Sequence, residues 1–493
     1  MFLWILITSG AFAFFASMGI GANDAANAFA TSIGSKALSM QQAVLLAAIF
    51  ETLGAILMGS HVTDTIRKGI SNYECFQEEP EILMYGCMWV ILSVGLWLFL
   101  ASKYEMPVST THSCVGGMVG MTMMLKGSEC VVWYKSVDTF PYVGGVSGIV
   151  LSWFLSPLFS AIFAIILFSS LRTFVLRSNF ESFRINITYP ILIGSTLTIN
   201  SFFIIYKGAK GIGLDDIPLE LALSISFGIG GAVALISIPF IPKIKHIVKK
   251  RHKLREHLKN KSNIQFTLHS KEEDLIKKNK EKLFIKSEKE LHKVISIHKN
   301  AEKFDKRNEE MFKYLQVFTA VCDAFSHGAN DVANAIGPFA VIYTIYFSDG
   351  ELSKKTSMGN DAYWILGLGG IGIAVGLLVY GYKITRAIGD KLCKVTPSRG
   401  VAIELSSALV IITGSRLKIP LSTTHCQIGS TTGIGLLENR NCSGINCKIF
   451  GKTIFGWLIT CVIVGLTSAV LTGQGIYSHT PAQIFVNCSN NTY

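Results

Sequence analysis

Long apolar runs separated by shorter polar stretches make up most of this chain of 493 residues. A helix needs about 20 apolar residues to cross a bilayer. Twelve runs approach or exceed this length, which predicts an all-α polytopic membrane protein with about 12 transmembrane segments. The runs cover residues 2–18, 40–60, 82–101, 108–125, 141–170, 186–206, 217–241, 314–347, 363–382, 401–415, 421–437 and 450–471.

One long polar segment, residues 243–313, interrupts these runs and holds 22 Lys and Arg against 11 Asp and Glu. We interpret it as a basic hydrophilic cytoplasmic loop. Before it we expect a first transmembrane repeat (1–170) and two linking transmembrane helices (171–242); after it we expect a second transmembrane repeat (314–472) and an extracellular tail (473–493). Seven spans before the loop and five after it place both chain ends outside. The apolar N-terminus lacks a basic start, so we expect a retained first span rather than a signal peptide.

Composition narrows the class of protein further. Half of the residues are hydrophobic and 16% are charged, which excludes a large soluble core. The excess positive charge lies in one segment without a groove-reading motif, which argues against nucleic acid as a partner. The eleven cysteines show no metal-ligand spacing. Cys75 and Cys488 are expected to face an oxidising exterior, and the sequence leaves their pairing open.

Two motifs occur twice, in the same order. Gly21–Ala28 returns as Gly328–Ala335, with seven of the eight positions identical. We call these the first and second octets. The hexapeptide Pro107–His112 returns as Pro420–His425 and differs only at its second position. The chain is therefore a duplicated unit. Because the first octet enters the membrane from outside and the second from inside, the two halves are predicted to have inverted topology, with hairpin-like broken helices.

Each octet places one Asp and two Asn in an apolar helix. Asn23 and Asn27 are four residues apart and share a face beside Asp24, so their oxygens can converge on a small cation; Asn330, Asp331 and Asn334 repeat the pattern. The alternative is that these side chains join helices through hydrogen bonds. Two copies in inverted halves favour cation binding, because an intramembrane carboxylate is costly without a partner.

The hexapeptides predict a chain break followed by a helix start. Proline ends a preceding helix, and Ser109 and Ser422 are good N-cap residues for the next one. A helix N-terminus inside the membrane attracts an anion, and four threonine hydroxyls add donors there. The alternative is an ordinary capped turn. The residues concerned are Ser109, Thr110, Thr111, Ser422, Thr423 and Thr424.

Further titratable residues lie in apolar surroundings. Glu51 and Glu404 occupy different places in the two repeats, and Glu404 could also be a helix-end residue that reaches the membrane interface. His112 and His425 are expected to hydrogen-bond near the turns rather than ligate a metal. His327 is open between a packing role and a proton-sensitive one.

With both octets, both hexapeptides, the run Thr65–Gly69 and the central polar loop, the chain resembles the inorganic phosphate transporter family, the type III sodium–phosphate symporters. The likeness covers both halves except the loop and the tail. Ala25 departs from the family's usual Val, and Thr110 stands where many eukaryotic members have Gly. The resemblance implies that Glu51 and Glu404 are required for transport, that phosphate binds Ser109, Thr110, Thr111, Ser422, Thr423 and Thr424, and that coupling cations bind Asn23, Asp24, Asn27, Asn330, Asp331 and Asn334.

We therefore expect a symporter that imports inorganic phosphate by alternating access, in the plasma membrane, coupled to sodium and without another metal or cofactor. It is not expected to be an enzyme, and its partners are phosphate, sodium and the lipid bilayer, with a homodimer left open. One alternative is a proton-coupled phosphate or sulfate transporter on the same fold. Others are a phosphate sensor or surface receptor without net transport, and, weakly, a metallohydrolase built on His112 and His425, which lacks a nucleophile with a base.

Overall fold

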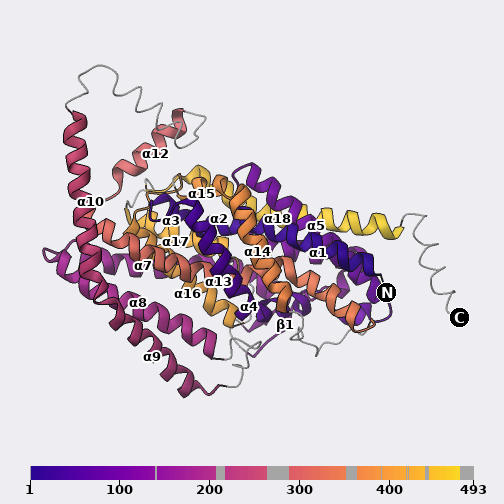
Figure 1. Cartoon of the computed structure of the whole chain (residues 1–493). Coiled ribbons are helices and arrows are strands. Elements are labelled where there is room, and N and C mark those ends of the chain that lie inside the picture. Colours follow the sequence, from indigo (N-terminus) through magenta and orange to yellow (C-terminus); the bar gives the residue numbers. More distant parts are fainter. Residues whose placement is uncertain are drawn as a thin grey trace.

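The computed structural model describes residues 2–138, 142–206, 217–263, 288–350, 363–389, 391–417, 419, 421–438 and 444–477. This part of the chain is almost entirely helical, which confirms the predicted all-α class (Figure 1). Its one pair of strands is a short antiparallel ladder of β1 (Lys135–Ser136) and β2 (Val143–Gly144), in which Lys135 faces Gly144.

The first half begins with a long helical segment that contains the first octet. Here α1 (Leu3–Ile20) passes through one π-helical stretch, η1 (Gly21–Ala25), into α2 (Ala26–Ala28) and α3 (Ala30–Gly34). A capping box formed by Ser39 and Gln42 starts the next helix. The elements that follow are α4 (Met40–Gly69), η2 (Tyr73–Phe76), α5 (Pro80–Lys103), α6 (Thr110–Lys126), η3 (Ser128–Cys130), α7 (Gly145–Leu171) and η4 (Arg172–Leu176).

The second octet lies in one uninterrupted helix of 42 residues, α13 (Lys306–Phe347). This helix starts before the predicted span at residue 314, because the Asp305 carboxylate caps it by accepting from the backbone N–H of Arg307 (2.9 Å). The remaining elements are α8 (Glu181–Ile205), α9 (Leu219–Ser237), α10 (Phe240–Asn263), α12 (Glu288–Asn300), α14 (Tyr363–Tyr380), α15 (Tyr382–Gly389), α16 (Pro397–Arg416), α17 (Thr423–Glu438) and α18 (Cys447–Tyr477). The segment predicted as a loop therefore also contains helices.

Helices of the two halves pack in matched pairs. Within each half, the octet helix lies against the first helix of its own hairpin, α1 against α5 and α13 against α16. Across the halves, the second hairpin helix lies against the last helix of the other half, α6 against α18 and α17 against α7. A twofold relation between duplicated halves requires this reciprocal pairing. The inverted orientation of the halves in a membrane stays a prediction.

The octet glycines lie where helices of different halves are in close contact. A Cβ atom on Gly21 would lie 1.8 Å from the backbone oxygen of Ile373 in α14. A Cβ atom on Gly328 would lie 2.1 Å from the backbone oxygen of Glu51 in α4. Side-chain atoms do not approach backbone oxygens this closely, so glycine is required at both positions for the helices to touch.

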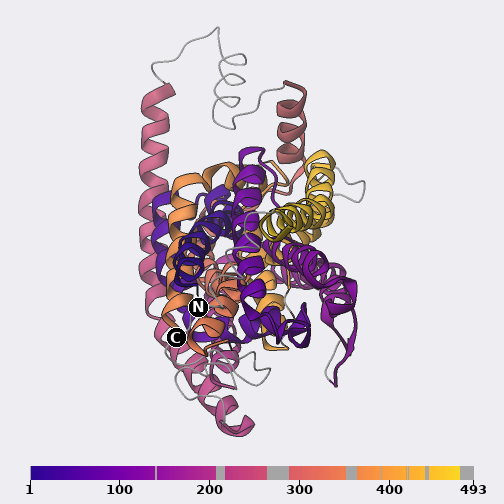
Figure 2. The ribbon, with the colours of Figure 1, turned by 90° about the vertical axis from the view of Figure 1, so that its right-hand side faces the viewer.

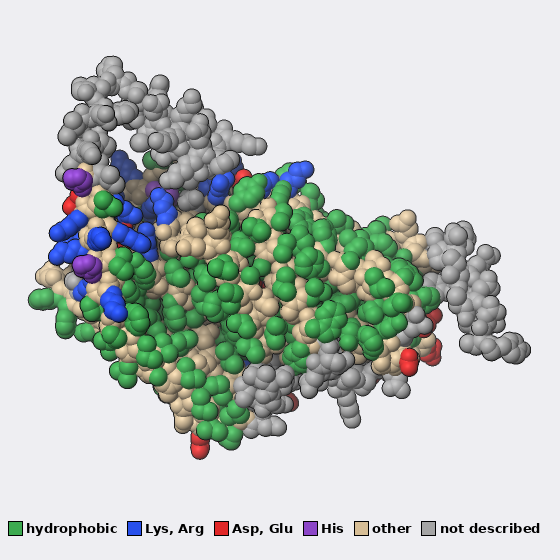
Figure 3. Space-filling view, viewed as in Figure 1, with side chains coloured by type: hydrophobic (Ala, Val, Ile, Leu, Met, Phe, Trp, Pro, Cys, Tyr) green, Lys and Arg blue, Asp and Glu red, His purple; other side chains and the backbone are tan. Residues whose placement is uncertain are grey.

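Eight helices of the described part are long and apolar enough to cross a membrane. The other four predicted spans coincide with α6, α13, α16 and α17. Of these, α6 and α17 start at hairpin tips and have only 17 and 16 residues, while α13 and α16 contain buried charged side chains. Hydrophobic side chains cover most of the visible face, and Lys and Arg gather around α10 (Figure 3). The protein is thus a multi-pass membrane protein.

Segments at the margin of the bundle include the basic helix α10 and a disulfide-linked loop. Both views show α10 along one edge of the molecule (Figures 1 and 2), and in Figure 1 the start of α1 and the end of α18 lie at the opposite end. Cys75 forms a disulfide with Cys130, which joins η2 to η3. The sequence had placed Cys75 and Cys488 on an oxidising exterior and left their pairing open; Cys488 lies outside the described residues. A disulfide is typical of an oxidising compartment, which fits the predicted outer side.

Candidate functional site

The two hexapeptides form the tips of two helical hairpins, as predicted. In the first, α5 ends at Lys103 and α6 begins at Thr110; in the second, α16 ends at Arg416 and α17 begins at Thr423. Both predicted N-caps are confirmed, because the backbone N–H of His112 donates to Ser109 Oγ and that of His425 donates to Ser422 Oγ, each at 3.3 Å. Pro420 lies outside the described residues.

The two tips contact each other directly. The Thr111 hydroxyl of the first tip donates to the carbonyl oxygen of Leu421 in the second (2.9 Å). In return, the Thr424 hydroxyl of the second tip lies 3.1 Å from the carbonyl oxygen of Val108 in the first and also contacts Asp24 Oδ1. Both threonines are buried. Segments from opposite halves therefore meet inside the protein, with backbone N–H groups and hydroxyls gathered at one place.

The carboxylates of both octets lie buried at this meeting point. Thr110 Oγ1 lies 2.9 Å from Asp24 Oδ2 and 3.1 Å from Asp331 Oδ1. From the other tip, Thr423 Oγ1 lies 3.3 Å from Asp24 Oδ1 and also contacts Asp331 Oδ2. A hydroxyl has one proton and cannot donate to two carboxylates at once. Asp24 also accepts from Thr424, so both carboxylates lie in one buried polar cluster. Two like charges this close repel each other, an arrangement that favours an added cation.

The asparagines of the octets divide into two roles. Asn23 holds the first tip: its Nδ2 donates to Ser102 Oγ (3.0 Å) and Met106 O (3.1 Å), and its Oδ1 accepts from Val108 N–H (2.9 Å). Asn23 thus turns to its own hairpin, whereas Asn27 lines a narrow cavity with Asp24.

Three buried amide oxygens beside the carboxylates are left without a hydrogen-bond partner among the described residues, namely Oδ1 of Asn27, Asn330 and Asn334. The amide nitrogens of the latter two are engaged, Asn330 Nδ2 with Leu421 O (2.8 Å) and Asn334 Nδ2 with Asp331 Oδ1 (2.7 Å). Buried polar atoms are normally paired. Unpaired amide oxygens next to carboxylates are ligands that a small hard cation prefers.

His327 bridges two carboxylates of the site. Its Nδ1 lies 2.7 Å from Glu51 Oε2, and its Nε2 lies 2.9 Å from Asp331 Oδ2, an ion-pair distance without hydrogen-bond geometry. Asp24, His327 and Asp331 each offer one ligand atom within 4.8 Å of the others, a grouping that could hold a metal ion. The structure therefore joins Glu51 to the second octet through a histidine that the sequence left open between two roles.

Glu404 is separate from the carboxylate pair and lies in a shell of donors. Its Oε1 accepts from Thr31 (2.7 Å), Ser32 (2.6 Å) and Gln316 (3.0 Å), and its Oε2 accepts from Thr319 (2.7 Å). The carboxylate is fully buried. The alternative of a helix-end glutamate that reaches the membrane interface is therefore wrong, because α3 and α13 cover this end of α16.

His112 and His425 meet edge to face, and each ring packs against a tryptophan. Their ring centroids are 4.7 Å apart; His112 lies 3.6 Å from Trp153, and His425 lies 3.7 Å from Trp457. Each Nδ1 also contacts the backbone oxygen of the opposite tryptophan, His112 with Trp457 (3.0 Å) and His425 with Trp153 (2.9 Å). The histidines thus bind helices behind the tips and belong to no metal-ligand group in the described part.

The sequence reasoning missed Asp323. This buried carboxylate lines the narrow cavity with Asp24, Asn27 and His327, and neither of its oxygens has a hydrogen-bond partner among the described residues. A signal for it was present. Asp323, His327 and Asp331 are spaced four residues apart, which places all three on one face of a helix.

A profile of the phosphate transporter family matches residues 20–468. A protein of Pyrococcus abyssi that is provisionally named a phosphate permease is 34% identical to this chain. The match covers 92% of this chain and 93% of the other protein. Sodium-dependent phosphate transporter 1 of Rattus norvegicus is 25% identical over 97% of this chain and 96% of its own. A solved structure of a sodium-dependent phosphate transporter matches with a TM-score of 0.72 and 30% identity, over 95% of this chain and 98% of that one.

Proposed function

This chain belongs to the phosphate transporter family, and on that basis we propose that it is a symporter that imports inorganic phosphate together with sodium by alternating access. As a member of this family it is a transporter and not an enzyme. Sodium coupling is supported by the names of one relative and of the solved structure. The plasma membrane as its location and a homodimer stay predictions.

Sodium binds, in this proposal, at the carboxylates of both octets. Asp24 and Asp331 supply the negative charge, and the oxygens of Asn27, Asn330 and Asn334 complete the ligand set. Neither octet nor hexapeptide contains Lys or Arg. An anion could not approach the buried carboxylates without cations, because like charges repel strongly in a medium of low dielectric constant. Bound sodium is thus the source of positive charge for phosphate.

Phosphate binds between the two hairpin tips. The hydroxyls of Thr110, Thr111, Thr423 and Thr424 and the first N–H groups of α6 and α17 point to this place, with Ser109 and Ser422 as the helix caps. The tips now bond to each other, so phosphate would exchange the Thr111–Leu421 and Thr424–Val108 hydrogen bonds for its own. Binding and opening of the tips are therefore linked.

The observation that carries the proposal is that Thr110 and Thr423, one from each tip, each contact both carboxylates. We would measure uptake of radiolabelled phosphate into liposomes with an inward sodium gradient, and with choline in place of sodium. Wild type should need sodium. Asp24→Asn should lower uptake by about 100-fold, because it removes the charge that holds the cation.

Asp138→Asn is the matched control, because Asp138 is exposed and precedes β2. It should leave uptake unchanged. Uptake that is indifferent to sodium in the wild type would overturn sodium coupling, and phosphate binding without any uptake would favour a sensor.

One observation supports a second candidate, a proton-coupled transporter of phosphate or sulfate. Glu51, His327 and Asp331 form a chain of titratable groups that reaches the second octet, and such chains carry protons in other membrane transporters. The same liposomes separate the two candidates. Uptake driven by an inward pH gradient in choline would favour protons, whereas uptake that requires sodium at both pH 6 and pH 8 would favour sodium.

A further inference from the structure

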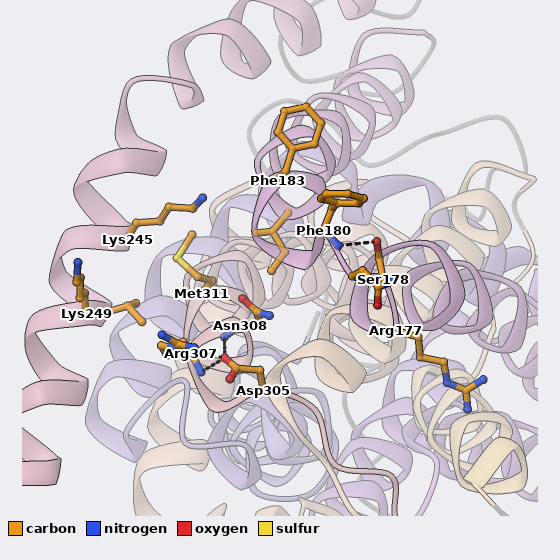
Figure 4. A pocket seen from close by; sticks show the side chains of 13 residues that line it. Arg177, Ser178, Phe180, Phe183, Lys245, Lys249, Asp305, Arg307, Asn308 and Met311 are labelled. Carbon is orange, nitrogen blue, oxygen red and sulfur yellow. Dashed lines mark hydrogen bonds and ion pairs between the residues drawn. The ribbon is translucent and has the colours of Figure 1, made fainter.

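A second cavity, of about 850 Å³, lies between the η4–α8 junction, α10 and the first turn of α13 (Figure 4). It is distinct from the octet site, because Asn308 at the cavity and Asn330 are separated by about 30 Å along α13. Its volume is in the range of small-molecule sites, about 300–1,000 Å³, and exceeds what a single inorganic phosphate would fill.

The cavity lies at the boundary of the membrane. The spans of α7–η4 and α9 end at Leu176 and Ser237, and the span of α8 begins at Phe183, which lines the cavity. Lys245 follows Ser237 by eight residues, about 12 Å along a helix. The exposed rings of Phe180 and Phe183 (70% and 64%) suit an interface, where aromatic side chains gather. The cavity is therefore at the level of lipid headgroups on the predicted inner side.

The lining carries an excess of positive charge. Among the residues whose side chains the structure describes, the basic lining residues Arg177, Lys245, Lys249 and Arg307 face one acidic residue, Asp305. The Asp305 carboxylate accepts from the backbone N–H groups of Arg307 (2.9 Å) and Asn308 (3.3 Å) as the cap of α13. It is thus committed to the helix and offsets only part of the charge.

Two of the cations are the main candidates for a ligand. Arg177 is directed away from the cavity in Figure 4 and donates two hydrogen bonds of 2.8 Å to Glu302. Lys245 and Lys249 line the cavity from α10, and the Lys245 side chain extends toward the side of Phe180 and Phe183 (Figure 4). Partial burial lowers the pKa of the Lys245 ammonium, a cost that a bound anion would relieve.

We propose that this cavity binds the phosphorylated headgroup of a membrane lipid, through Lys245 and Lys249, while Arg307 is paired with Asp305 (3.5 Å). Clustered basic residues on the cytoplasmic side of membrane helices are suited to such headgroups. The ligand would join α10 and the η4–α8 junction to the start of α13, the helix that carries Asp331. Its binding is independent of whether sodium or protons drive transport.

The test is a binding titration with the purified full-length protein in detergent, followed by native mass spectrometry. The probes are dioctanoyl phosphatidylinositol 4-phosphate, dioctanoyl phosphatidylcholine and the soluble headgroup analogue inositol 1,4-bisphosphate. We expect the phosphorylated lipid to bind at least about tenfold more tightly than the other two. The double variant Lys245→Gln/Lys249→Gln should remove that advantage.

Lys250→Gln/Lys253→Gln is the matched control, since it removes two charges from the same helix without touching the lining. It should bind the phosphorylated lipid within about twofold of wild type, and unchanged melting temperatures would show that both double variants fold. Equal binding by Lys245→Gln/Lys249→Gln and wild type would overturn the proposal. Equally tight binding of inositol 1,4-bisphosphate would overturn the assignment to a lipid and leave a site for soluble phosphates.

Discussion

The two octets are nearly identical in sequence and differ in what surrounds them. The first passes through a π-helical stretch, whereas the second lies within the regular helix α13. Asn23 uses its whole amide on its own hairpin, while Asn330 makes one hydrogen bond to Leu421 and keeps a free oxygen. His327 precedes the second octet, and Ile20 stands at the same place before the first.

This difference shows that duplication did not produce two equal sites. The first octet holds a hairpin tip in place and contributes Asp24 to the centre. The second contributes Asp331 together with a histidine, a second carboxylate at Glu51 and two free amide oxygens. Cation binding should therefore depend on both aspartates, whereas any response to protons should depend on the second octet alone.

The largest effect should come from the feature that both octets share. Gly21→Ala and Gly328→Ala would each push a Cβ into a backbone oxygen, at 1.8 and 2.1 Å. We expect either change to prevent helix contact and abolish folded protein, as measured by fluorescence-detected size-exclusion chromatography. Gly228→Ala in α9 is the control, because its Cβ would meet nothing within 4 Å. A normal yield of folded protein from only one of the two octet variants would show that the two glycine contacts are not equivalent.

Changes to the histidine bridge of the second octet should have an intermediate effect on phosphate uptake. His327→Gln removes the bridge between Glu51 and Asp331, and we expect phosphate uptake to fall by about tenfold. Glu51→Gln should have a similar effect, and the double variant should be no worse than either single variant, because both changes break one network. Additive losses in this double-mutant cycle would contradict the bridge.

The smallest effect should separate the asparagines. Asn23→Ala leaves the buried Val108 N–H without its acceptor and should lower stability by about 1–3 kcal/mol. Asn330→Ala removes one hydrogen bond to Leu421 and should lower stability by about 1 kcal/mol. It should weaken the sodium dependence of uptake more than Asn23→Ala does. Thermal unfolding in detergent measures the first quantity and sodium titration of uptake the second. Equal effects of the two variants on both quantities would show that the octets are equivalent.

Much of the fold follows from the sequence alone. Apolar runs of membrane length predict most of the helices, since burial in lipid requires apolar surfaces. Repeated octets and hexapeptides reveal the duplication, and the serine caps of α6 and α17 follow from local side-chain chemistry. The identities of Asp24 and Asp331 as central residues follow in the same way, because a carboxylate inside an apolar helix needs a partner.

Tertiary structure alone decided what those residues meet. Thr110 and Thr423 reach both carboxylates only because hairpins from opposite halves place their tips together. Cys130 pairs with Cys75, and Glu404 is enclosed by α3 and α13, through contacts between segments far apart in the chain. Local sequence determines periodicity and capping, which depend on neighbours within a few residues. Which distant side chains become neighbours depends on how the helices pack, and close packing is a property of the whole bundle.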